Sequence, residues 1–137
     1  MAIAVCALLI GLSACASVSF QDKISGQGDI QITAWATLRG EFLIYSDARS
    51  MHRQLRHPHC ISGVFADQAE IMKSLAQYDG KLVTLTGEPF VYSDLRDEER
   101  PILPRKILAG SVVLNACLGP KVLLIKAMKL ASQTGSL

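Results

Sequence analysis

Apolar and polar residues alternate with a period of two along residues 30–38. One side of this segment consists of Ile30, Ile32, Ala34, Ala36 and Leu38, and the other carries Gln31, Thr33, Trp35 and Thr37. This alternation is typical of a β-strand with one buried face. Gly40 interrupts the pattern and the apolar run EFLIY follows it. A glycine inside a strand marks a bend, so we expect one strongly bent strand or two short ones.

Similar patterns predict further strands along the chain. In KLVTLTGEPFVYSD, residues 81–94, Val83 and Leu85 share one face and Gly87 breaks the alternation. The run CISGVF is a short strand candidate. Two more strands are expected in KILAGSVVLNACLG and PKVLLIKAMKLA, with a Gly-Pro turn between them. Because Lys121 and Lys126 punctuate the last apolar run, we expect that strand at a sheet edge.

Only residues 68–78 show the pattern of a helix. Asp67 is suited to be its N-cap, and Glu70 follows three residues later, as in a capping box. The apolar stripe consists of Ile71, Met72, Leu75 and Ala76. Gly80 marks the end of the helix. The chain therefore combines one helix with several strands.

Several bent strands and one helix predict a mainly β fold. Mid-strand glycines are what closing a small barrel requires. The stretches ATLRGEF and YDGKLVTLTGEPF resemble the glycine-centred strands of OB-fold proteins. This resemblance implies a small OB-like β-barrel with one helix. The alternative is an α+β sheet with the helix packed on one face, and neither fold would by itself define a function.

The chain opens with an uncharged apolar run, MAIAVCALLIGLSAC. It is shorter than the roughly 20 apolar residues that cross a bilayer, and polar residues follow it. A short apolar run ending in small residues is typical of a secretory signal sequence. The tetrad Leu12-Ser13-Ala14-Cys15 resembles the lipobox of bacterial lipoproteins, in which Leu, a small residue and Gly or Ala precede a cysteine.

This resemblance implies that Cys15 is lipidated. In that family the cysteine thiol receives a diacylglyceryl group with fatty-acyl chains such as palmitate, and the signal is cut before the cysteine. Two acyl chains anchor a protein stably, where one would be marginal. Because Ala16 rather than Asp follows the cysteine, the resemblance implies the outer membrane, with the protein facing the periplasm. The alternative is a buried N-terminal helix with a core cysteine.

The expected organisation has four parts. Residues 1–14 are the signal peptide, and residues 15–29 contain the lipidated Cys15 and a polar, flexible tether rich in Ser and Gly. Residues 30–131 form the barrel-like domain, and residues 132–137 are a frayed tail.

After removal of the signal, Cys60 and Cys117 are the cysteines left besides the lipidated one. An even number in an oxidising compartment favours a Cys60–Cys117 disulfide. The alternative is two buried free thiols.

The stretch HRQLRHPHC, residues 52–60, holds the densest chemistry in the chain. It contains all three histidines, His52, His57 and His59, next to a cysteine. Imidazole nitrogens suit zinc or copper, so a metal site is one hypothesis, although the spacing follows no defined motif. Arg49, Arg53 and Arg56 suggest a second hypothesis, the binding of phosphate, an acidic sugar or a lipid headgroup. The alternative for both sets is a solvated basic loop without a specific ligand, and this is the interpretation that we favour.

No catalytic motif or cofactor-binding loop is recognisable, so we expect neither an enzyme nor a cofactor. Ser62-Gly63 lacks the preceding glycine of a nucleophile elbow. The 14 basic and 12 acidic residues leave a net charge of +2, which is too even to indicate a nucleic-acid partner.

The sequence therefore predicts a lipid-anchored binding or structural module of the bacterial cell envelope. Its partners are the membrane, through the N-terminal lipid, and an envelope protein or an anionic ligand. The alternative is a small metal-handling or catalytic envelope protein that uses the loop of His52, His57 and His59.

Overall fold

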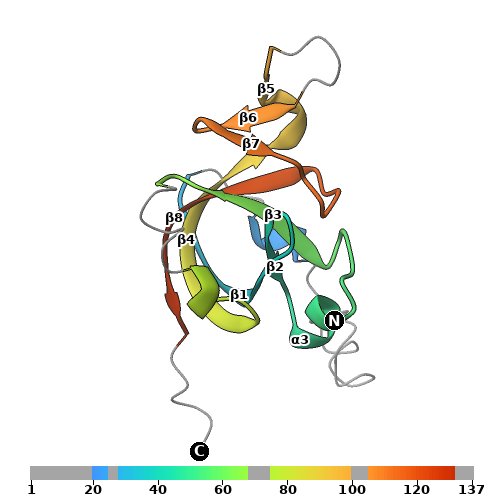
Figure 1. Ribbon diagram of the computed structural model, residues 1–137, viewed down its shortest axis with the longest axis vertical. Helices are drawn as coiled ribbons and strands as arrows, with labels where there is room; N and C mark the ends of the chain where they lie inside the picture. The colour runs from blue at the N-terminus through green and yellow to red at the C-terminus, as the bar shows by residue number, and fades with distance from the viewer. Residues whose placement is uncertain (1–19, 25–27, 68–74, 100–104, 132–137) are drawn as a thin grey trace, which may run out of the picture.

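The computed structural model describes residues 20–24, 28–67, 75–99 and 105–131. Five strands close into a barrel: β1 (Ile30–Leu38), β2 (Phe42–Tyr45), β3 (Cys60–Phe65), β4 (Lys81–Val91) and β8 (Lys121–Leu130). The spatial order is β1-β2-β3-β8-β4, and β4 pairs with β1 to complete the circle (Figure 1). β3 and β8 run parallel and the other pairs are antiparallel. This is the small OB-like barrel that the sequence predicts, and the open α+β sheet is not formed.

A second, smaller sheet lies on the outside of the barrel. It consists of β5 (Arg96–Asp97), β6 (Lys106–Leu108) and β7 (Ser111–Val113), all antiparallel. This sheet belongs to the connection between β4 and β8 and forms the upper part of the molecule in Figure 1. Its buried residues pack against outward-facing side chains of the barrel, and this cluster consists of Val64, Leu108, Val113, Val122 and Leu124.

The described helical segments are short. They are η1 (Gln21–Ile24), α3 (Ala48–His52), η2 (Leu75–Gln77) and η3 (Tyr92–Asp94). Most of the predicted helix over residues 68–78 lies outside the described residues. Its described end is the 3-10 turn η2, which buries Leu75 in the barrel core as the apolar stripe predicts. The segment that contains α3 was not predicted to be helical.

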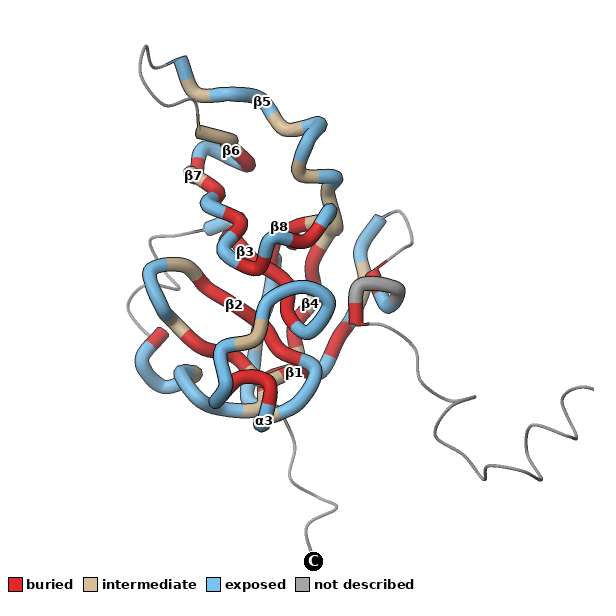
Figure 2. Tube along the Cα trace, turned by 90° about the vertical axis from the view of Figure 1, so that its right-hand side faces the viewer, coloured by how far each residue is buried: buried red, intermediate tan, exposed pale blue. Residues whose placement is uncertain are grey.

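The alternating pattern of the strands places one face of each inside the barrel. Figure 2 shows buried residues along the strands and exposed residues along most of the connections. Ile32, Ala34 and Ala36 of β1 pack in this interior with Val83 and Leu85 of β4, as their alternation predicts. The interior holds no charged residue among those that the structure describes.

Both predicted glycine breaks are present, and they act differently. Gly40 lies in the turn between β1 and β2 with a φ of 74°, so the N-terminal pattern forms two strands. Gly87 lies where the register of β4 against β8 shifts. A Cβ atom on Gly87 would lie 2.7 Å from the carbonyl oxygen of Leu124, which is too close for any other residue.

Two sequence expectations are wrong. β8 is not an edge strand, because it pairs with β3 on one side and β4 on the other. Its two lysines are accommodated by partners: Lys121 Nζ donates a hydrogen bond to the Ile24 carbonyl, and Lys126 pairs with Asp29 and Glu88.

The second error concerns the predicted tether over residues 15–29. Phe20 directly precedes η1, and Phe20 and Ile24 are both buried in the barrel core. The folded domain therefore includes residues 20–24, which precede the expected start near residue 30. The predicted signal peptide, Cys15 and the predicted tail over 132–137 lie outside the described residues.

In the part of the chain that the structure describes, no helix has the length and apolar character needed to span a membrane.

Candidate binding site

The loop with the histidines and arginines is held to the barrel at several points. Asp47 caps α3: its carboxylate accepts hydrogen bonds from the Ser50 backbone N–H at 2.7 Å and from the Ser50 hydroxyl at 3.1 Å. The bond from the Ser50 backbone N–H is the largest cause that lowers the pKa of Asp47 below its usual value of 3.8. Further along, the His57 N–H donates to the Cys117 carbonyl at 2.7 Å. This loop is therefore ordered by its own contacts.

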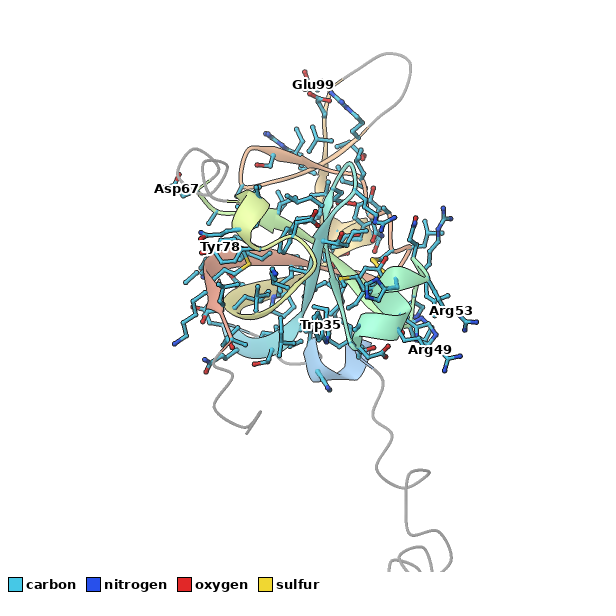
Figure 3. All side chains as sticks on the ribbon, turned by 60° about the horizontal axis from the view of Figure 1, so that its bottom comes forward. Trp35, Arg49, Arg53, Asp67, Tyr78 and Glu99 are labelled. Carbon is cyan, nitrogen blue, oxygen red and sulfur yellow. A yellow bond between two sulfur atoms is a disulfide. The ribbon has the colours of Figure 1, made fainter. Side chains whose placement is uncertain are left out.

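The predicted disulfide between Cys60 and Cys117 is confirmed. It joins the first residue of β3 to the loop that leads into β8, and both cysteines are fully buried. Figure 3 shows the sulfur–sulfur bond behind α3. The Ser62 hydroxyl accepts a hydrogen bond from the Cys117 N–H at 3.1 Å, so this buried serine is occupied by a structural contact.

The disulfide belongs to an apolar cluster on the outer face of β2 and β3. This cluster consists of Leu43, Tyr45, Met51, Cys60 and Cys117, with Trp35 packed against it. In OB-folds the outer face of these two strands commonly binds oligonucleotides or oligosaccharides. Here α3 and the Cys117 loop cover that face, and burial raises the pKa of Tyr45, opposed by the charge of Arg39.

The six candidate ligand residues lie on the surface beside this cluster, and all are exposed: Arg49, His52, Arg53, Arg56, His57 and His59. Arg49 and Arg53 point outward from α3 in Figure 3. Within the described residues, no group of three or more His, Cys, Asp or Glu side chains could hold a metal ion. Cys60 is in the disulfide and cannot be a metal ligand. The metal and anion hypotheses stay predictions.

A cleft of about 590 Å³ opens on another side of the barrel, where the sequence suggested nothing. Its walls come from the β1–β2 turn, the end of β3, residues 75–79 and the chain after β6. The apolar lining residues are Leu38, Phe42, Val64, Phe65, Leu75, Val112 and Leu114. Clefts of 300–1,000 Å³ with mainly apolar walls are the usual form of ligand sites.

Glu41 joins two walls of this cleft. One of its carboxylate oxygens accepts the backbone N–H groups of Leu114 and Asn115 at 3.2 and 3.1 Å. The other oxygen accepts the Ala116 N–H at 2.8 Å. One side chain thus fixes the β1–β2 turn to the loop that follows β7.

A second carboxylate in the cleft lining braces the opposite side. Asp79 accepts hydrogen bonds from the Thr37 hydroxyl and the Leu38 N–H, both at 3.0 Å. Among the residues that the structure describes, the cleft lining contains two acidic residues and no basic one. Its electrostatic potential is therefore expected to favour positive charge.

Leu114 gives this cleft an exposed apolar margin. Its side chain is 56% exposed, although it lines the cleft. The sequence carried only an indirect signal of this site, since Glu41 and Asp79 each adjoin a turn glycine. The hydrogen bonds by which Glu41 and Asp79 hold the cleft walls join residues 37–41 to residues 79 and 114–116. No local sequence pattern reveals such contacts.

No family model, no curated protein and no solved structure matches the chain.

Proposed function

We propose that this protein is a lipid-anchored binding module of the bacterial cell envelope, and that the cleft takes apolar side chains of a partner protein. The observation that carries the binding proposal is the cleft itself, an apolar hollow whose walls are fixed by Glu41 and Asp79. Fixed walls favour binding because little side-chain or loop entropy is lost when the ligand enters.

The chemistry of the lining defines the partner more closely. Apolar walls and the exposed Leu114 favour apolar side chains, since exposed apolar surface marks sites of protein contact. The carboxylates of Glu41 and Asp79 favour a partner segment in which Lys or Arg flanks those side chains. The partner is therefore expected to be an apolar protein segment with basic flanks.

The proposal of a membrane anchor rests on features of the sequence. The tetrad from Leu12 to Cys15 and the uncharged apolar run before it support lipidation of Cys15. The disulfide between Cys60 and Cys117 is consistent with an oxidising compartment such as the periplasm.

The cleft is tested with two short peptides and the chain that starts at Ala16. All described contacts lie within residues 20–131, so this chain retains them. One blocked peptide has the sequence Lys-Leu-Leu-Lys and the other Glu-Leu-Leu-Glu, and amide chemical-shift mapping follows each titration. We expect the lysine peptide to bind more tightly and to shift cleft residues such as Phe42 and Val112. The proposal fails if the glutamate peptide binds equally well or if the shifts lie elsewhere.

Two exposed leucines provide a matched pair of variants. Leu114 lines the cleft, and Leu118 in the same loop is 63% exposed and does not. Leu114→Ser should weaken binding of the lysine peptide about tenfold, because about 1–1.5 kcal/mol of apolar burial is lost. Leu118→Ser should leave the affinity unchanged. An equal effect of the two substitutions would show that the peptide does not enter the cleft.

A further inference from the structure

The exposed arginines of the α3 region form no ion pair with any described carboxylate, whereas several other basic residues do. Arg105 pairs with Glu98 at 2.6 Å, Lys106 with Asp97 at 2.9 Å and Lys126 with Asp29 at 2.7 Å. By contrast, Arg49, Arg53 and Arg56 form no ion pair within the described part of the chain.

The carboxylate of Asp47, at the N-terminus of α3, is engaged by hydrogen bonds and also interacts with His59. Asp47 accepts hydrogen bonds from the backbone and hydroxyl of Ser50 and from the Ser46 hydroxyl. The three arginines and the exposed His52, His57 and His59 lie on one surface, beside the capping Asp47, and we name this surface the basic face. The disulfide and the α3 cap hold this face in a fixed shape.

The start of the folded domain limits how far the basic face can lie from the membrane. Phe20 is buried in the barrel core, and it is five residues after Cys15. Five residues span at most about 18 Å, even when fully extended. If Cys15 carries the anchor, the barrel must lie at the membrane surface, within about two Debye lengths of the headgroups at physiological salt.

We propose that the basic face docks on the anionic headgroups of the membrane that holds the protein. This proposal rests on the proposed lipid anchor for its setting. In Figure 3 η1 lies at the lower edge of the molecule and α3 at its lower right, and the exposed Lys23 of η1 adds positive charge near the end of the domain that follows Cys15. Arginines near an anionic bilayer each contribute about fivefold to binding. Docking through this face would fix the orientation of the domain and hence the direction in which the cleft opens.

Vesicle flotation of the unlipidated chain starting at Ala16 tests the basic face separately from the anchor. The vesicles consist of phosphatidylcholine alone or of phosphatidylcholine with phosphatidylglycerol, at low and at physiological salt. We expect binding to the anionic vesicles only, and weaker binding at the higher salt. Equal binding to both kinds of vesicle, or none to the anionic ones at low salt, overturns the proposal.

Charge reversal at two places separates the basic face from the charge of the whole molecule. Arg49→Glu with Arg53→Glu should lower the affinity for anionic vesicles about 25-fold or more, at about fivefold per arginine. Lys81→Glu with Lys129→Glu changes the net charge equally at exposed sites outside the face, and it should have a much smaller effect. Equal losses in the two variants contradict the proposal. Arg49→Gln with Arg53→Gln repeats the first test without adding negative charge.

Inorganic phosphate distinguishes a docking surface from a discrete anion site. At constant ionic strength, about 10 mM phosphate should not displace the chain from anionic vesicles. The reason is that the basic face would bind through the combined electrostatic potential of its charges and not through a single anion site. Displacement by phosphate would instead show a small-anion site and would overturn membrane docking. All of these experiments use the chain without Cys15. A negative result would therefore contradict membrane docking by the basic face, and lipidation of Cys15 is tested separately.

Discussion

At the scale of single residues, Glu41 has the largest structural consequence for the cleft. Its carboxylate is the acceptor for three consecutive backbone N–H groups, from Leu114 to Ala116. Hydrogen bonds to a charged group are roughly twice as strong as neutral ones. Because the loop after β7 bends around this side chain, the cleft wall formed by Leu114 depends on it.

Glu41→Ala should therefore destabilise the protein by about 2–4 kcal/mol, since three N–H groups lose a charged acceptor. Glu41→Gln keeps one carbonyl oxygen as an acceptor, so it should lower the free energy of unfolding by about half as much as Glu41→Ala. Denaturant unfolding of the Ala16 chain measures both effects. Glu99→Ala, at an exposed carboxylate in Figure 3, is the control and should change the free energy of unfolding by less than about 0.5 kcal/mol. If Glu41→Ala is as mild as this control, Glu41 does not hold the loop.

At the scale of secondary structure, the strands with strict alternation could be predicted and the short or polar elements could not. β1 and β4 carry a period-two pattern because one face of each lies in the barrel core. α3 has five residues, ARSMH, which are too few for a helical period, and its cap at Asp47 is recognisable only with the geometry known. β5 has two residues and no pattern.

The disulfide between Cys60 and Cys117 links two secondary-structure elements and should stabilise the fold measurably. It closes a loop of 56 intervening residues between β3 and the segment before β8. Cys60→Ser with Cys117→Ser should lower the free energy of unfolding by about 2–4 kcal/mol, mainly because the unfolded chain gains freedom. The reduced wild-type chain should lose a similar amount. A thiol titration of the freshly purified, unreduced protein should find neither Cys60 nor Cys117 free, and two free thiols would contradict the cross-link.

At the scale of the whole molecule, closure of the barrel explains what the sequence did and did not predict. The glycine breaks indicated strong bending, which closure requires. The same closure pairs β8 with a strand on each side. Its lysines can still lie in such a strand because they reach partners at the surface while its apolar face fills the core. The cleft arises only when distant segments meet, so its residues show no pattern of their own, whereas the basic face lies within one segment whose arginines and histidines the sequence already showed.

The burial of Phe20 changes the expected relation between the domain and the membrane. A flexible tether of about 14 residues would let the barrel move freely, but only residues 16–19 separate Cys15 from the buried Phe20. With so short a linker, the lipid would hold both the basic face and the cleft near the bilayer surface. The position of both surfaces at a membrane therefore depends on lipidation of Cys15.

Mass spectrometry of the mature N-terminus tests this claim most directly. The chain is expressed in a bacterium with its leader, recovered from the membrane fraction and digested. We predict an N-terminal peptide that begins at Cys15 and carries a diacylglyceryl group, whereas Cys15→Ala leaves an unprocessed, unlipidated chain. An N-terminal peptide with an unmodified Cys15 thiol, or a Cys15→Ala chain that matures and stays with the membrane like the wild type, would contradict the account.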